Sequence, residues 1–258
     1  MNDWIIRFLL AASTMMVPVL SRAQFDGIIL DRNPPQAESR KELDACLKIL
    51  ECSRCTNMEA LVEKFEKEFP DSEFLPQIYR TVMEYHLSKG EEDAAIQAGE
   101  RVLAKVPNDV YVLPVLSRIL PNSVNDCQKS RANLERAEDY ARRLLKNAPQ
   151  IQVASSVSLQ ARDQMIAQLN SSAHEALGIV AYKHGKLVES IAELRLCTEQ
   201  NPVPTGAQFY RLGLALLSAN PESHEAEQAL RRARELGPEA VRNKADELLS
   251  KCRNVQRK

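Results

Sequence analysis

Apolar residues recur at helical spacing along most of the chain, and two of the apolar runs carry the same signature. One run contains the pair Leu177-Gly178 and the other contains Leu212-Gly213, so that the two glycines lie 35 residues apart. A period of this size is typical of stacked helical hairpins. A single hairpin cannot bury its apolar face alone and has to stack on its neighbours. The pattern therefore predicts an all-α repeat protein with surfaces suited to binding.

A second alignment within the chain supports the period. A glycine, a small residue and a proline recur at one common offset of 95 residues, in the order Gly90, Ala95, Pro107 and then Gly185, Ser190, Pro202. The small and proline positions return in two further copies, as Ala137 and Pro149 and as Ala226, Ala233 and Pro238. Four prolines therefore close four copies of one unit.

Each of these positions has a physical role. Gly185 stands where a first helix has to end and the chain reverses, and glycine adopts a positive φ there without a Cβ penalty. Small side chains such as Ser190 let the two helix backbones approach each other closely. Pro202 then stops the second helix, because proline lacks the N–H group and restricts the residue before it.

Together these positions resemble the tetratricopeptide repeat (TPR), with its Leu-Gly, Gly, small and Pro positions. The match is closest from Ser171 to Pro204. One copy departs from the pattern, because Val82-Met83 stands where the Leu-Gly pair is expected. The resemblance implies a right-handed α-solenoid of stacked antiparallel helix pairs with a C-terminal capping helix.

The same pattern divides the chain into segments. The first hairpin is degenerate, because Val62 and Phe65 stand where small residues are expected. The predicted segments are a signal peptide (1–23), a linker (24–39), the degenerate hairpin (40–73), two TPR-like hairpins (74–149, the second with a long loop at 121–128), a helical segment followed by two well-formed repeats (150–238, with repeats at 171–204 and 206–238), and a capping helix and tail (239–258).

The N-terminal residues have the features of a bacterial signal peptide. The apolar run from Phe8 to Leu20 has the length of a signal-peptide core, and Ser21-Arg22-Ala23 offers small residues for cleavage after Ala23. We therefore expect export to the periplasm or the medium. An uncleaved, membrane-tethering anchor is the alternative, although Pro18 and Arg7 argue against a full span. Removal of the segment changes the net charge only from −1 to −2, which gives no support to a nucleic acid partner.

The expected export affects the interpretation of the six cysteines, because disulfide bonds can form in an oxidising compartment. We expect a structural bridge among Cys46, Cys52 and Cys55, which would stabilise the degenerate hairpin. Redox or metal chemistry at Cys52 and Cys55 is the alternative, but no thioredoxin-like pattern and no second ligand pair accompany them. Cys197 occupies the small core position that Ala233 holds in the next copy and is expected to be a buried thiol.

The sequence offers little for catalysis. The four histidines are dispersed, and the sequence lacks a nucleophile elbow, a phosphate-binding loop and a dinucleotide fingerprint. Charged residues make up 27% and aromatic residues only 5%, which suits a helical protein with a distributed core. We therefore expect no enzyme activity, no cofactor and no metal.

The resemblance also implies where a partner would bind. In TPR domains the first helix of each pair lines a concave groove, and the corresponding candidates here are Arg80, Glu84, Glu175, Ile179, Tyr182, Tyr210, Arg211 and Leu214. Alternatively, these side chains pack between repeats or face solvent. The family's clamp for a chaperone's carboxyl terminus uses paired Lys and Asn, where this chain has Glu175 and Ile179. A peptide with an acidic end is therefore not the expected ligand.

The function expected from these observations is a non-catalytic, exported scaffold that binds a protein or peptide. An accessory subunit of an envelope enzyme, or of a secretion or polymer-handling assembly, is the alternative. A thiol redox protein acting through Cys52 and Cys55 is a weaker one.

Overall fold

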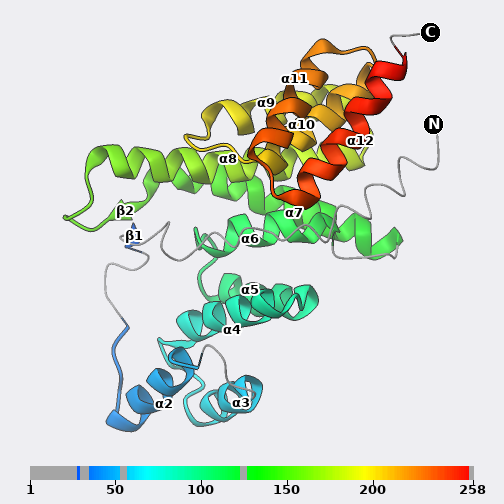
Figure 1. Ribbon diagram of the computed structural model, residues 1–258. Helices are drawn as coiled ribbons and strands as arrows, with labels where there is room; N and C mark the ends of the chain where they lie inside the picture. The colour runs from blue at the N-terminus through cyan, green and yellow to red at the C-terminus, as the bar shows by residue number, and fades with distance from the viewer. Residues whose placement is uncertain (1–27, 30–34, 53–56, 123–126, 256–258) are drawn as a thin grey trace.

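The computed structural model describes residues 28–29, 35–52, 57–122 and 127–255 and shows a stack of antiparallel helix pairs (Figure 1). The pairs are α2 (Arg40–Leu50) with α3 (Met58–Glu68), α4 (Leu75–Lys89) with α5 (Glu92–Lys105), α6 (Val112–Ile119) with α7 (Cys127–Asn147), α8 (Leu159–Lys183) with α9 (Leu187–Gln200), and α10 (Gly206–Ala219) with α11 (His224–Leu236). The helix α12 (Glu239–Val255) packs on the last pair. The predicted all-α solenoid is therefore confirmed, and the signal peptide at 1–23 lies outside the described residues.

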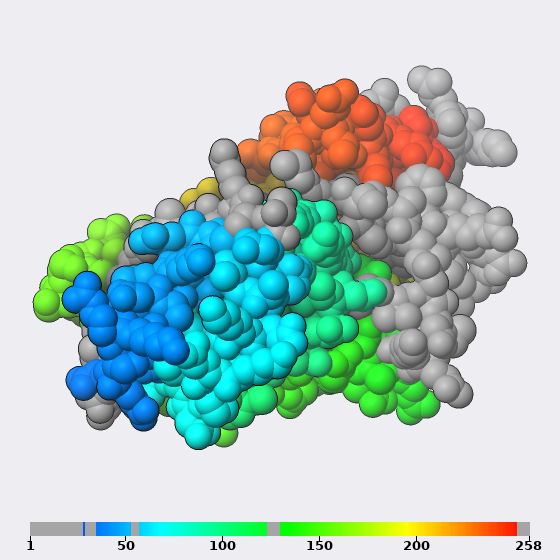
Figure 2. Space-filling view, turned by 90° about the horizontal axis from the view of Figure 1, so that it is seen from below, coloured from blue at the N-terminus to red at the C-terminus, as the bar shows by residue number. Residues whose placement is uncertain are grey.

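The stacking is sequential. Each first helix packs on the second helix of its own pair, and the first helices α6, α8, α10 and the cap α12 also contact one another in that order. In Figure 2 the hairpins from α2 to α7 form adjoining bands from blue to green, and the orange and red C-terminal helices lie away from the blue end. No helix within the described ranges is long and apolar enough to cross a membrane.

The Leu-Gly repeat is explained by the contact inside each hairpin. A Cβ added to Gly178 would lie 2.6 Å from Cγ of Leu194, and a Cβ on Gly213 would lie 2.7 Å from Cγ of Leu230. Both leucines are fully buried. The glycine of the first helix therefore makes room for a leucine of the second.

In the copy without a Leu-Gly pair the buried glycine lies on the second helix. At the common offset of 95 residues, Met83 corresponds to Gly178 and Gly99 corresponds to Leu194. Both Met83 and Gly99 are buried. A Cβ on Gly99 would also lie 2.9 Å from Cδ2 of Leu116, so this glycine admits a side chain from α6. In this copy the glycine thus makes room for a side chain of the next hairpin rather than for one inside its own hairpin.

The helix ends use the glycine and proline positions of the repeat. Gly90 and Gly185 both adopt φ of 74° at the ends of α4 and α8. The prolines lie just past the second helices, Pro107 after α5 and Pro202 after α9, while Pro149 lies in the short 3₁₀ helix Ala148–Gln150.

Two features between the hairpins differ from the expectation. The helix α8 runs for 25 residues without a break through position 171, so the predicted helical segment and the following repeat share one helix. The N-cap Ser158 starts it by accepting a hydrogen bond from the Ala161 amide, and no Gly or Pro interrupts the next eighteen residues. A second 3₁₀ helix, Leu120–Asn122, occupies part of the predicted long loop, and residues 123–126 lie outside the described ranges.

The predicted all-α fold included no β-sheet, but a short β-ladder is present. The strand β1 (Ile28–Ile29) pairs antiparallel with β2 (Gln152–Val153), and Ile28 lies opposite Val153. Both residues are branched and pack against the core, which favours extended backbone. Part of the predicted linker is thus attached to the connection between α7 and α8.

The buried apolar residues fall into three clusters. The largest extends from Cys46 in α2 to Val180 in α8. A second cluster joins α9, α10 and α11, and a third joins α10 and α11 to the cap α12. The core is therefore distributed along the stack, as expected for a repeat protein.

Candidate binding face

Polar side chains from three consecutive first helices meet on one side of the stack. We use the term first-helix face for this region, defined by Arg118 of α6, Glu175 and Tyr182 of α8, and Arg211 and Ser218 of α10. Three of these five residues, Glu175, Tyr182 and Arg211, were predicted from the sequence. The face is held together by contacts between neighbouring repeats.

The strongest of these contacts joins α8 to α10. Nη1 of Arg211 lies 2.5 Å from Oε1 of Glu175, whose side chain is only 7% exposed, while that of Arg211 is 24% exposed. Ion pairs shielded from water to this degree interact more strongly than exposed ones. Glu175 is therefore neutralised by its neighbour and does not present a free negative charge.

A second contact links the same two helices. The hydroxyl groups of Tyr182 and Ser218 lie 2.7 Å apart, and burial raises the pKa of Tyr182. Ile179 is buried one turn before Tyr182, and Leu214 lies half-buried on α10. The side chain of Tyr182 thus occupies the junction between two repeats and remains partly accessible.

The second cation of this region, Arg118, was not among the candidates predicted from the sequence. Its Nε is buried and has no hydrogen-bond partner. Burial lowers the pKa of Arg118, the neighbouring Arg211 lowers it further, and Glu175 opposes the shift. The sequence did contain a signal for this residue, because Arg118 is the only charged residue in the apolar run from Val110 to Leu120.

Arg80 and Glu84 lie on α4, outside this cluster. Arg80 is held by the buried carboxylate of Asp109, with Nε 2.7 Å and Nη2 2.5 Å from Oδ2. Oδ1 of Asp109 accepts from the amides of Tyr111 and Val112, each at 3.0 Å, at the start of α6. Arg80 therefore joins two repeats rather than presenting a free guanidinium, while Glu84 is half-buried one turn further along.

Tyr210 was expected to point outward, and the structure corrects this. The side chain is 3% exposed and packs with Leu230 and Val241 under the cap α12. Its hydroxyl is buried without a hydrogen-bond partner, and burial together with nearby Glu247 raises its pKa to about 12. Helical spacing could not distinguish a groove position from one covered by the next helix.

The cysteines divide into two groups. Cys46 is a free, fully buried thiol, so the bridge predicted among Cys46, Cys52 and Cys55 does not include it; burial, followed by the charge of Glu42, raises its pKa to about 11. Cys52 is disulfide-bonded, and its partner is neither Cys46 nor Cys197, because both are free. Cys55 lies outside the described residues, so its pairing stays a prediction. Burial also raises the pKa of Cys197, which lies beside the hydroxyl of Ser171.

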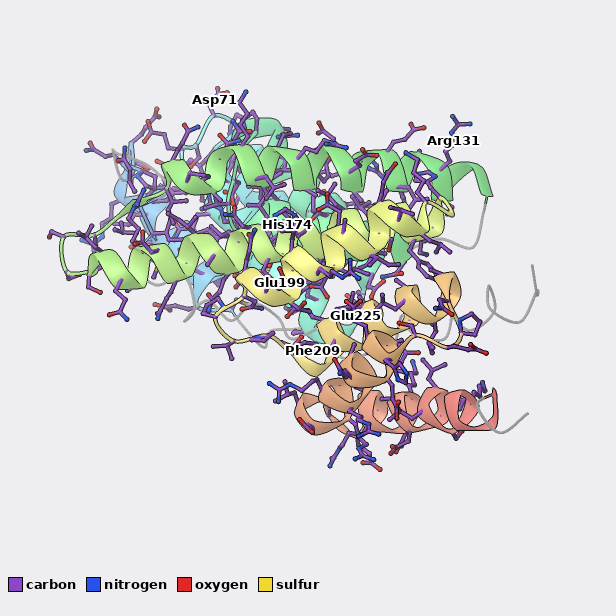
Figure 3. All side chains as sticks on the ribbon, turned by 90° about the horizontal axis from the view of Figure 1, so that it is seen from above. Asp71, Arg131, His174, Glu199, Phe209 and Glu225 are labelled. Carbon is purple, nitrogen blue, oxygen red and sulfur yellow. The ribbon has the colours of Figure 1, made fainter. Side chains whose placement is uncertain are left out.

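Two histidines of the described helices, His174 and His86, contact carboxylates, and His86 contacts two of them, because its Nε2 also lies 3.7 Å from Oε1 of Glu59 on α3. His174, labelled in Figure 3, lies on α8. Its Nδ1 is 2.7 Å from Oε2 of Glu193 on α9, and Nδ1 of His86 is 2.7 Å from Oε2 of Glu91. Within the described ranges no group of three or more His, Cys, Asp or Glu side chains is arranged to hold a metal ion. These pairs connect neighbouring helices.

Comparison with known proteins yields structural likeness only. No protein family and no curated protein sequence matches the chain. A thermophilic TPR protein of Thermus thermophilus matches 81% of this chain and 97% of its own, with 18% identity and a TM-score of 0.49. A TPR protein from Parabacteroides merdae matches 82% of this chain and 97% of its own, with 11% identity and a TM-score of 0.29. Because both TM-scores are low, the description as a TPR-like solenoid rests on the observed helix pairs and not on these two matches.

Proposed function

We propose that the protein is a non-catalytic, exported scaffold that binds a segment of a partner protein on its first-helix face. The observation that carries this proposal is that α6, α8 and α10 bring Arg118, Glu175, Tyr182, Arg211 and Ser218 together at the junctions between repeats. Partly buried Arg and Tyr side chains are the types that most often anchor protein partners. An extended segment crossing this face would contact several repeats at once.

Two alternatives use the molecule differently. As an accessory subunit of an envelope enzyme or of a secretion or polymer-handling assembly, the protein would use the same face with a permanent partner. As a thiol redox protein it would act through Cys52 and Cys55. Reaction of the folded protein with thioredoxin distinguishes the redox alternative from the other two. A structural disulfide would resist reduction, while a redox site would exchange rapidly with the thiols of thioredoxin.

The scaffold proposal is tested by site-specific cross-linking in the source cells. A photo-reactive amino acid at Leu214, beside Arg211 on α10, is expected to capture one defined protein. The matched control is the same amino acid at Arg231, an exposed position on the outer helix α11. Equal capture from both positions, or none from Leu214, would contradict binding on the first-helix face.

Export gives a separate prediction. N-terminal sequencing of the protein recovered from its source is expected to begin at Gln24, directly after Ala23, because the preceding residues have the small-residue pattern that signal peptidase reads. Recovery in the soluble envelope or medium fraction should accompany cleavage. An intact Met1 in a membrane fraction would instead support the tethered alternative.

A further inference from the structure

We propose that two copies of this chain pair through the outer side of α9, with the two helices antiparallel and Ala192 at the two-fold axis. The contact surface consists of Val188, Ala192 and Leu196, which follow one another at intervals of four residues. This spacing places all three on one side of a helix. We call this surface the α9 stripe.

The α9 stripe is apolar and yet exposed. Val188 is 84% exposed and Leu196 is 37% exposed, and Ala192 between them is also exposed. The opposite side of the same helix buries the polar residues Ser190 and Thr198. A surface helix normally buries its apolar residues and exposes its polar ones. The helix α9 therefore carries apolar residues on a side that its own chain leaves uncovered.

The other second helices show that the repeat does not require an apolar outer side. The stripe lies two residues before, two residues after and six residues after the small residue Ser190. The same places around Ala95, Ala137 and Ala226 hold only polar or charged residues. These are Asp93, Gln97 and Arg101 on α5, Glu135, Asp139 and Arg143 on α7, and His224, Gln228 and Arg232 on α11. Of these four copies, α9 alone has an outer side suited to contact with another protein surface.

The order of residues along α9 matches a second copy of the same helix. In an antiparallel pair with its two-fold axis at Ala192, each residue before the axis faces the residue equally far after it in the other copy. Val188 therefore meets Leu196 of the second copy. Glu189 likewise meets Arg195, so that opposite charges face each other on both sides of the axis. The small side chain at the axis lets the two helices approach closely.

The two charged residues already belong to ion pairs within their own chain. Nε and Nη2 of Arg195 lie 2.7 Å and 2.5 Å from the two carboxylate oxygens of Glu225 on α11. Nζ of Lys186 lies 3.4 Å from Oε2 of Glu189. Both pairs are solvent-accessible, so the contact would join them into a row of alternating charge. This order fits a rotated copy of the helix, whereas a lipid surface has no corresponding arrangement of charges.

The expected dimer is weak and leaves the proposed binding face free. A single helix of 14 residues from each copy forms the contact, and stable interfaces bury about 1,200–2,000 Å² in total. We therefore expect dissociation in the micromolar range. The residues of the first-helix face lie on α6, α8 and α10, so a dimer would present two such faces to one partner.

Sedimentation velocity of the purified protein tests the pairing. The protein is expected to change from monomer to dimer as its concentration rises. Ala192→Glu should keep it monomeric, because two like charges would meet at the axis. Gln228→Glu, at the equivalent exposed position on α11, is the matched control and should leave the dimer unchanged. A protein that is monomeric at every concentration, or a dimer that survives Ala192→Glu, overturns the proposal.

A charge exchange tests the antiparallel arrangement. Arg195→Glu and Glu189→Arg should each weaken the dimer by at least about tenfold, because like charges would then face each other across the contact. An equimolar mixture of the two variants should dimerise again, since both facing pairs are opposite in the mixed dimer. Rescue by mixing cannot come from a variant that fails to fold. A mixture that stays monomeric overturns this arrangement. Monomers that bind lipid vesicles or a different protein through Val188 would assign the stripe to another occupant and overturn the pairing.

Discussion

Gly178→Ala is expected to lower the free energy of unfolding by about 1–3 kcal/mol, the usual effect of overpacking a core. In an ordinary helix interior the same change stabilises by roughly 0.5–1 kcal/mol, so the sign itself is informative. The reversal follows from the contact inside the hairpin, because the new Cβ would lie 2.6 Å from Cγ of Leu194 and 3.4 Å from its backbone nitrogen. Leu194 is fully buried and has little room to move.

Denaturant unfolding of a double-mutant cycle measures the effect. Leu194→Ala alone should cost about 2–5 kcal/mol by opening a cavity. In the double variant the alanine at 178 fits the vacated space, so the combined loss should fall short of the sum by at least about 1 kcal/mol. Additive losses would contradict the contact between Gly178 and Leu194 as the reason for the Leu-Gly repeat.

Asp109→Ala is expected to be comparably damaging, with a loss of roughly 2–4 kcal/mol from the combined removal of a helix cap and a shielded ion pair. The buried carboxylate serves two repeats at once, because it caps α6 through the amides of Tyr111 and Val112 and binds Arg80 of α4. The expected loss of stability is smaller than that for breaking a fully buried ion pair, because the side chain of Arg80 is 18% exposed.

Thermal and denaturant unfolding of two further variants separate these roles. Asp109→Asn keeps an oxygen for the cap but loses the charge, so it should retain part of the stability. Asp44→Ala removes an exposed carboxylate, 3.5 Å from Nε of Arg40, and should cost less than about 1 kcal/mol. Equal effects of Asp109→Ala and Asp44→Ala would show that Asp109 does not join the two repeats.

The fold could be predicted because the repeat imposes local steric requirements that the sequence displays. Gly178 and Gly213 are needed where a leucine from the second helix enters, and Gly90 and Gly185 lie where the backbone has a positive φ. Pro202 marks a helix end by its missing donor. These requirements act within one hairpin, so one-dimensional spacing is sufficient to reveal them.

The binding face was less predictable because it depends on contacts between hairpins. Spacing identified Glu175 and Arg211 on first helices but could not show that they bind each other. The same spacing placed Tyr210 outward, although α12 covers it. Arg118 and Asp109 were overlooked; an isolated cation within an apolar run, and an acid just before that run, were the available signals.

The division of the core into three clusters creates a boundary, which we call the seam, between α8 and the helices that follow it. The buried residues of α8 belong mainly to the large cluster, whereas α9 to α12 are stabilised by two smaller ones. Because α10, α11 and the cap α12 share a cluster of their own, we expect them to open locally before the remainder unfolds. Arg118 and Arg211 lie on opposite sides of this seam, so a partner that contacts both would hold the two parts together. Partner binding would then raise the free energy needed to open the last hairpin. By the same coupling, a substitution that favours opening of this hairpin would lower the affinity for the partner by the same free energy.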